Sequence, residues 1–172
     1  MSSAARLIEK SMNASPPLKI VGGRKKIGDL KTGLAGEYLV CADLILSGHE
    51  VLRSDQSAPY DLVVDVHSRL VRVQVKTTTV AKRYPQHKHV LGYIWTCRRG
   101  KGGRRVYAKS EFDVLALVAL DCRRIAYIHQ SEAKQIIQIH VSGHIKNPIR
   151  SFDSCSFDDA MTVMGGIQGA GL

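Results

Sequence analysis

Three polar residues in the middle of the chain, Asp61, Gln74 and Lys76, have the side-chain types that phosphodiester hydrolysis requires. A carboxylate is a hard oxygen ligand for a divalent cation, and the carbonyl of a carboxamide is a further, neutral ligand. Such a cation polarises a phosphate and lowers the pKa of its bound water. A lysine ammonium stabilises the pentacovalent phosphate, or orients and deprotonates the attacking water. Brought together, the three groups would form a site for cutting a phosphate backbone.

The surrounding pattern predicts that they do come together. Valines alternate with polar residues from Leu70 to Thr77, which predicts a strand. Side chains two apart share a face, so Gln74 and Lys76 point the same way, with the valines turned to the core. A second strand over 60–66, joined by a tight turn, would pair positions that add up to about 135 to 137. Asp61 would then lie opposite Gln74 or its next two neighbours.

The rest of the chain predicts one helix followed by short strands. Apolar residues at helical spacing predict a helix over 34–47, with Thr32 or Gly33 as its N-cap and Gly48 as its stop. Strands are also expected at 50–52, 90–96, 114–120 and 125–128. Residues 135–141 are either a strand or part of a short helix. Elements of this kind around one central sheet indicate an α/β or α+β fold.

A chain of 172 residues favours one domain. We expect a flexible leader over 1–22, a single domain over 23–160 and a frayed tail over 161–172. The four cysteines form no zinc-binding pattern, which indicates free thiols. No stretch reaches the roughly 20 apolar residues of a membrane helix, and no secretory signal is evident. A cytoplasmic protein without a membrane partner is therefore expected.

The charge balance points to a polyanionic partner. Lys and Arg outnumber Asp and Glu by 25 to 15, a formal net charge of +10, which favours capture of DNA or RNA. The basic residues gather in two segments, one ahead of the helix and one rich in glycine. The first contains Arg24, Lys25, Lys26 and Lys31, and the second contains Arg98, Arg99, Lys101, Arg104 and Arg105. Of two further acids, Asp65 near the turn is expected to be a solvated hairpin residue, and Asp113 before a buried strand is expected to be structural.

The order of the polar residues resembles the signature of the PD-(D/E)XK nuclease superfamily. Pro59-Tyr60-Asp61 precedes Gln74-Val75-Lys76, and the upstream helix carries a glutamate in Gly36-Glu37-Tyr38-Leu39. The likeness implies a restriction-endonuclease-like core, in which helices flank a central mixed β-sheet. It also implies cleavage of DNA with Mg²⁺, for which Mn²⁺ is expected to substitute.

Two positions depart from the usual signature. Tyr60 separates the proline from the acid, and that proline is not catalytic. Gln74 stands where most members carry an acid, which removes one negative charge and favours one divalent ion over two. The intron-encoded homing endonucleases tolerate the same Q-x-K triplet.

The resemblance assigns roles to individual residues. Glu37, Asp61 and Gln74 would hold the metal, and Lys76 would serve the phosphate. The two basic segments would track the DNA backbone, which positions a duplex without reading its sequence. Thr77 would either bond a phosphate or only satisfy its strand. One site cuts one strand, so a homodimer or homotetramer is expected for double-strand cleavage.

Several functions fit this description. The leading one is a DNA-associated endonuclease that cuts duplex DNA, like a homing endonuclease. A Holliday-junction resolvase, which is similarly small and basic, is the alternative. A non-catalytic DNA-binding protein built on a nuclease fold and a nuclease that acts on RNA remain as further candidates.

Overall fold

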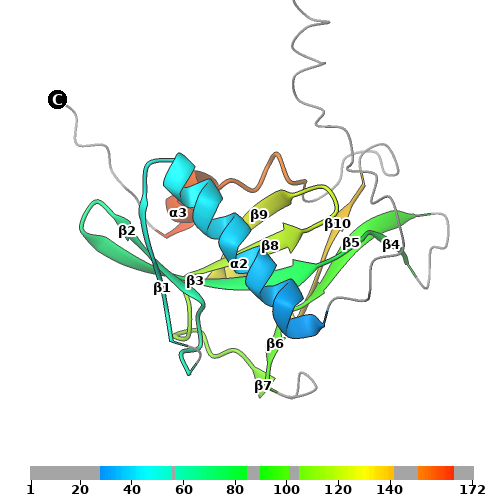
Figure 1. Ribbon diagram of the computed structural model, residues 1–172, viewed down its shortest axis with the longest axis horizontal. Helices are drawn as coiled ribbons and strands as arrows, with labels where there is room; N and C mark the ends of the chain where they lie inside the picture. The colour runs from blue at the N-terminus through cyan, green and yellow to red at the C-terminus, as the bar shows by residue number, and fades with distance from the viewer. Residues whose placement is uncertain (1–27, 56, 85–89, 101–104, 142–150, 165–172) are drawn as a thin grey trace, which may run out of the picture.

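The computed structural model describes residues 28–55, 57–84, 90–100, 105–141 and 151–164. Within them a central five-stranded sheet has the strand order β1-β2-β3-β8-β9 (Figure 1). The pairing of β3 with β8 is parallel and the other pairings are antiparallel, so the sheet is mixed, as expected. The strands are β1 (Glu50–Arg53), β2 (Leu62–Val66), β3 (Arg69–Thr78), β8 (Val114–Ala119) and β9 (Arg124–His129).

The β2–β3 hairpin has one of the registers that the sequence predicts. Leu62 pairs with Val73 and Val66 with Arg69, so paired positions add up to 135. His67 and Ser68 form the turn with φ values of 52° and 68°, the left-handed geometry that matches the twist of two-residue hairpins. Asp65 accepts a hydrogen bond from the Ser68 amide at 2.8 Å and is a hairpin residue, as expected.

The first described helix, α2 (Asp29–Leu46), begins ahead of the expected start at Leu34. Its N-cap is Gly28 rather than Thr32 or Gly33, and no side chain caps it. The expectation was wrong because it relied on a capping residue, and the helix starts without one. Its C-terminal end is as expected, because Gly48 follows with a φ of 91°, which suits glycine.

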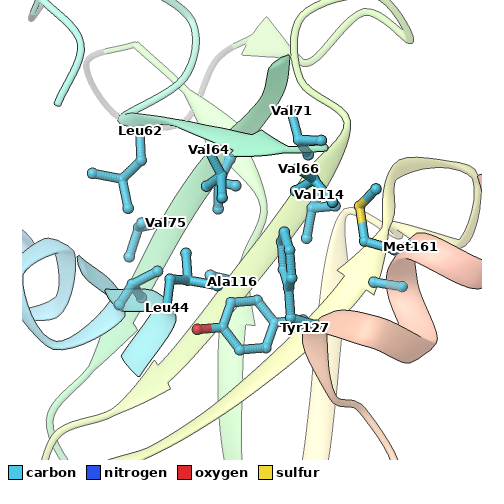
Figure 2. Packing of buried hydrophobic residues seen from close by; sticks show 14 of the residues in the cluster. Leu44, Leu62, Val64, Val66, Val71, Val75, Val114, Ala116, Tyr127 and Met161 are labelled. Carbon is cyan, nitrogen blue, oxygen red and sulfur yellow. The ribbon is translucent and has the colours of Figure 1, made fainter. Parts of the chain in front are cut away.

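Helix α2 packs across β3 and β8 along a line of small and branched residues, Gly36, Val40 and Leu44. A Cβ atom on Gly36 would lie 2.0 Å from Oγ1 of Thr77, so the close approach of α2 to β3 requires glycine. The core on this side also contains the valines of β3, as predicted. Figure 2 shows Leu44 of α2 and Met161 of the C-terminal helix against Val75, Val114 and Tyr127 of the sheet.

A smaller sheet covers the opposite face of β8 and β9. Its strand order is β10-β5-β4, from β4 (Lys82–Arg83), β5 (Leu91–Thr96) and β10 (Ile136–His140). Residues 135–141 therefore contain a strand, which resolves the alternative left by their sequence. Trp95 packs there with Leu115 and Leu117, so β8 is buried on both faces. Gln74, which pairs with Leu115, is buried as well.

Four short elements complete the described structure. The basic segment forms a hairpin of β6 (Arg98–Arg99) and β7 (Arg105–Val106). A 3-10 turn, η2, spans Gln130–Glu132. The helix α3 (Phe157–Val163) starts at a capping box of Ser156 and Asp159. Residues 161–163 were expected in a frayed tail, but they belong to α3 and Met161 is buried in the core.

The remaining expectations about the chain concern its ends and its cysteines. The leader expected over 1–22 and the end of the tail, 165–172, lie outside the described residues. None of the described helices is long and apolar enough to cross a membrane. All four cysteines are free thiols, as expected.

Candidate functional site

The main chain aligns the three polar residues at the end of the β2–β3 hairpin. The Asp61 amide, one residue before β2, donates to the Val73 carbonyl at 3.0 Å. This bond places the Asp61 side chain beside Gln74 and Val75, which both donate to it. Lys76 follows on the same face of β3 and pairs with Leu117 of β8. The expected meeting of carboxylate, carboxamide and ammonium is thus present in the structure.

Asp61 is held by two donors from β3. Its Oδ2 accepts from the Val75 amide at 2.7 Å and from Nε2 of Gln74 at 2.5 Å. Burial raises the pKa of this carboxyl from 3.8 to about 6, and the nearby charge of Glu37 adds to the rise. The Val75 amide, Lys76 and Arg53 act in the opposite direction. Asp61 is therefore an acid that ionises close to neutral pH.

Gln74 places a hydrogen-bond donor between two oxygen acceptors. Besides Asp61, its Nε2 donates to the main-chain carbonyl of Val75 at 3.1 Å. A partial positive charge thus sits where a carboxylate and a carbonyl converge, which is the environment that a hard cation also prefers. The donor set of Asp61, the Val75 carbonyl and, after rotation of the carboxamide, the Gln74 oxygen therefore fits a divalent ion. Within the described part of the chain, no three His, Cys, Asp or Glu residues are grouped as metal ligands.

Lys76 is held by the β6–β7 hairpin. Its Nζ donates to the main-chain carbonyl of Arg98 at 3.0 Å and lies 5.1 Å from the ring centroid of Tyr107. Burial lowers the pKa of Lys76, and the carboxylate of Asp61 partly offsets that effect. The ammonium is therefore fixed between a carbonyl and an aromatic face, and it releases its proton more readily than a solvated lysine.

Glu37 reaches the site from α2, one residue after the glycine that packs on β3. Its Oε2 accepts from Nη2 of Arg53 at 2.8 Å. Arg53 also donates to the hydroxyl of Tyr38 at 3.2 Å, and its guanidinium carbon lies 4.8 Å from the centre of that ring. Glu37 raises the pKa of Asp61, so the two acids are electrostatic neighbours, and Arg53 is the cation beside both of them.

The residues expected to bind DNA differ in their contacts and in their exposure to solvent. Arg98 donates to Gln135, whereas Arg99 and Arg105 both pair with Glu111 at 2.7 and 2.9 Å. Part of the charge of this hairpin is therefore neutralised within the fold. Lys31 is exposed on the first turns of α2. The other five basic residues, Arg24, Lys25, Lys26, Lys101 and Arg104, lie outside the described residues.

Thr77 does not share a face with Lys76. Its hydroxyl is buried under Gly36 of α2 and has no hydrogen-bond partner in the described structure. Of the two roles left open for this residue, the location inside the α2–β3 contact favours packing over a bond to phosphate. Asp113 is structural, as expected, because it bonds the side chain and the amide of Arg72 at 2.8 and 2.9 Å.

Three groups that contact the predicted site residues were not predicted from the sequence. Arg53, Tyr107 and the Arg98 carbonyl contact the predicted residues but carry no local pattern that marks them. Arg53 lies at the end of a strand whose predicted limit was Leu52. Tyr107 follows the basic segment, and only the fold of the hairpin brings its ring to Lys76.

Comparison with known proteins gives two findings. A family model described as PD-(D/E)XK endonuclease matches residues 24–152. Among solved structures, a bacterial homing endonuclease, I-Ssp6803I, superposes with a TM-score of 0.57 at 18% identity, over 80% of this chain and 91% of that chain. At this identity the likeness concerns the fold. No curated protein matches the chain.

Proposed function

Since the chain belongs to the PD-(D/E)XK endonuclease family, we propose that it hydrolyses phosphodiester bonds of duplex DNA with a divalent metal ion, at a site formed by Glu37, Asp61, Gln74 and Lys76. The observation that carries this proposal is the meeting of Asp61, Gln74 and Lys76 at the end of one hairpin. Acid, amide and lysine lie within one partly buried site, where electrostatic interactions are stronger than in water.

The proposed role of each residue follows from the chemistry of its side chain. Glu37, Asp61 and Gln74 would hold the ion, together with the Val75 carbonyl that already faces the Gln74 amide. Mg²⁺, or Mn²⁺ in its place, would polarise the scissile phosphate and lower the pKa of a bound water. Asp61 contributes its charge only when ionised, and its pKa of about 6 keeps it ionised at neutral pH.

Lys76 would act on the phosphate and on the attacking water. Its hydrogen bond to the Arg98 carbonyl and its place over Tyr107 fix the ammonium, so little reorganisation is needed when negative charge develops on the phosphate. The lowered pKa of Lys76 makes it a better proton acceptor near neutral pH than an ordinary lysine.

The retained site argues against a purely DNA-binding role. A protein that only binds a polyanion gains nothing from a carboxylate near the phosphate, since like charges repel. The exposed Lys31 and the β6–β7 hairpin would contact the backbone beside the site, together with the basic residues outside the described ranges. A dimer or tetramer would supply the second site that double-strand cleavage needs.

A substrate panel tests the proposal. Supercoiled plasmid, a synthetic four-way junction and an RNA duplex are incubated with Mg²⁺ and with EDTA, using wild type, Asp61→Ala and Asp65→Asn. Asp65 lies in β2, which follows Asp61 directly, but it bonds the hairpin turn, so its variant is the control. We expect cleavage of duplex DNA in Mg²⁺ by wild type and the control, and none by Asp61→Ala or with EDTA. Preference for the junction would reassign the substrate, and cleavage that persists in EDTA would contradict the metal.

A further inference from the structure

Arg53 pairs with one acid of the proposed site and precedes a residue that is hydrogen-bonded to the other. It is the last residue of β1, and the next residue, Ser54, donates its amide to the Asp61 carbonyl at 2.9 Å. The Arg53 side chain then reaches across to α2, where it pairs with Glu37 at 2.8 Å. One guanidinium thus bridges the helix and the strands that carry the site.

The charges around Arg53 make it the counter-ion of this acidic pair. Glu37 and Asp61 are two negative charges at one proposed site, and like charges close together are unfavourable. Arg53 is positively charged and pairs with Glu37 at 2.8 Å, so it offsets part of this negative charge. A divalent cation bound by the same two acids would supply the same compensation with twice the charge.

The Arg53 guanidinium and a divalent metal ion would compete for the Glu37 carboxylate. The Arg53–Glu37 bond uses Oε2, and a positive guanidinium next to a metal site repels the incoming ion. The side chain of Arg53 is 43% exposed and that of Glu37 22%, so the pair lies at the solvent edge of the site and a turn of the arginine would bring it out of the site. There it would meet the phosphate backbone of a bound duplex, which arginine binds with two parallel hydrogen bonds.

We infer that Arg53 is an exchangeable counter-ion: it pairs with Glu37 while the metal is absent, and it turns to a DNA phosphate when the metal takes Glu37. Metal binding and DNA binding are coupled through one side chain. This inference rests on the proposed function, because it assumes that Glu37 is a metal ligand.

The first test measures metal binding without DNA. Binding of Mn²⁺ is followed by electron paramagnetic resonance for wild type, Arg53→Met and the second neutral variant Arg53→Gln. Removal of the positive charge should tighten Mn²⁺ binding about three- to tenfold, since Glu37 is released and the repulsion is gone. Arg124→Met is the matched control, because Arg124 also pairs with an acid, Asp153, and lies 5.0 Å from an aromatic ring, that of Phe152. Its affinity for Mn²⁺ should equal that of wild type.

The second test measures the phosphate contact. Affinity for a duplex is determined over a range of salt concentrations in Ca²⁺ and in EDTA. One lost phosphate contact reduces the slope of log affinity against log salt by about 0.9. We expect this reduction for Arg53→Met in Ca²⁺, and identical slopes for the variant and wild type in EDTA.

The outcomes separate the two claims. Wild type that binds Mn²⁺, with unchanged or weaker binding in both neutral variants, overturns the counter-ion role alone. Equal salt slopes in Ca²⁺ overturn the turn to phosphate. Wild type that binds no Mn²⁺ at all contradicts the proposed function and removes this inference with it.

Discussion

The carboxamide nitrogen of Gln74 lies 2.5 Å from Oδ2 of Asp61 and 3.1 Å from the carbonyl of Val75, so an amide stands between two acceptors. An acid at position 74 would face a carboxylate and a carbonyl with no donor between them. Glutamine therefore stabilises the metal-free site by a hydrogen bond where a second carboxylate would repel the first.

The variant Gln74→Glu should destabilise the metal-free protein and strengthen its binding of a divalent metal ion. Without metal, the carboxyl pair shares a proton or repels, which lowers the free energy of unfolding by about 2 kcal/mol. With Ca²⁺ the extra negative charge should strengthen binding, so the metal should raise the melting temperature more than it does in wild type. Thermal unfolding in EDTA and in Ca²⁺ measures both effects. The control Gln138→Glu, on the exposed side of β10, should change neither the stability in EDTA nor the rise in melting temperature with Ca²⁺. Equal melting temperatures of Gln74→Glu and wild type in EDTA would contradict the stabilising role of Gln74.

Asp61→Asn should stabilise the metal-free protein at neutral pH. The folded pKa of Asp61, about 6, lies above its ordinary value of 3.8. The stabilisation linked to its proton is therefore complete below pH 3.8 and is lost as the pH rises through 6. Asparagine resembles the protonated form, so the variant should gain about 2 kcal/mol over wild type above pH 7, after allowance for partial exposure.

Denaturant unfolding in EDTA at pH 4 and at pH 7.5 measures that gain. The difference between Asp61→Asn and wild type should be small at pH 4 and appear only at the higher pH. A variant that is less stable than wild type at pH 7.5 would show that ionisation of Asp61 does not destabilise the folded protein.

The aromatic ring of Tyr107, more than its phenolic hydroxyl, should support the action of Lys76 in DNA cleavage. Burial raises the pKa of Tyr107, so the phenol stays protonated near neutral pH and offers Lys76 an aromatic face. Tyr107→Leu should slow single-turnover DNA cleavage about five- to tenfold, the equivalent of about 1 kcal/mol of cation–π interaction. Tyr107→Phe keeps the ring and should cut at the wild-type rate. Equal loss in both variants would assign the effect to the hydroxyl.

The contact between Gly36 and Thr77 should be visible in stability. Gly36→Ala forces a Cβ atom to within 2.0 Å of the Thr77 hydroxyl, and α2 must move away from β3. We expect a loss of about 2 to 3 kcal/mol in unfolding free energy. Thr77→Ala removes the hydroxyl and should restore part of that loss in the double variant. Additive effects in this double-mutant cycle would mean that the two residues are not in contact.

The sequence predicted the parts of the site that lie close together along the chain. Alternation placed Gln74 and Lys76 on one face of β3, and the short turn then brought Asp61 beside Gln74 and Val75, to which its side chain is hydrogen-bonded. These relationships depend only on the period of a strand and the length of a turn. The fold class followed from the same elements and from the family resemblance.

The parts that escaped prediction depend on contacts between distant segments. The start of α2 was misplaced because Gly28 caps it without a side chain. The burial of Gln74 arises beside β8, on the face that the smaller sheet helps to cover. The Arg53–Glu37 pair joins β1 to α2, and Tyr107 reaches Lys76 only through the β6–β7 hairpin. A single sequence carries no periodic signal for such pairings.

Single-turnover cleavage of duplex DNA by Lys76→Ala measures whether Lys76 acts in the chemical step, and DNA affinity is measured in parallel in Ca²⁺. Lys134→Ala, at an exposed position on the segment before β10, is the matched control. We expect Lys76→Ala to bind DNA within a few-fold of wild type and to cut at least about a hundredfold more slowly, while the control cuts at the wild-type rate. Cleavage by Lys76→Ala at the wild-type rate would contradict the assignment of the site.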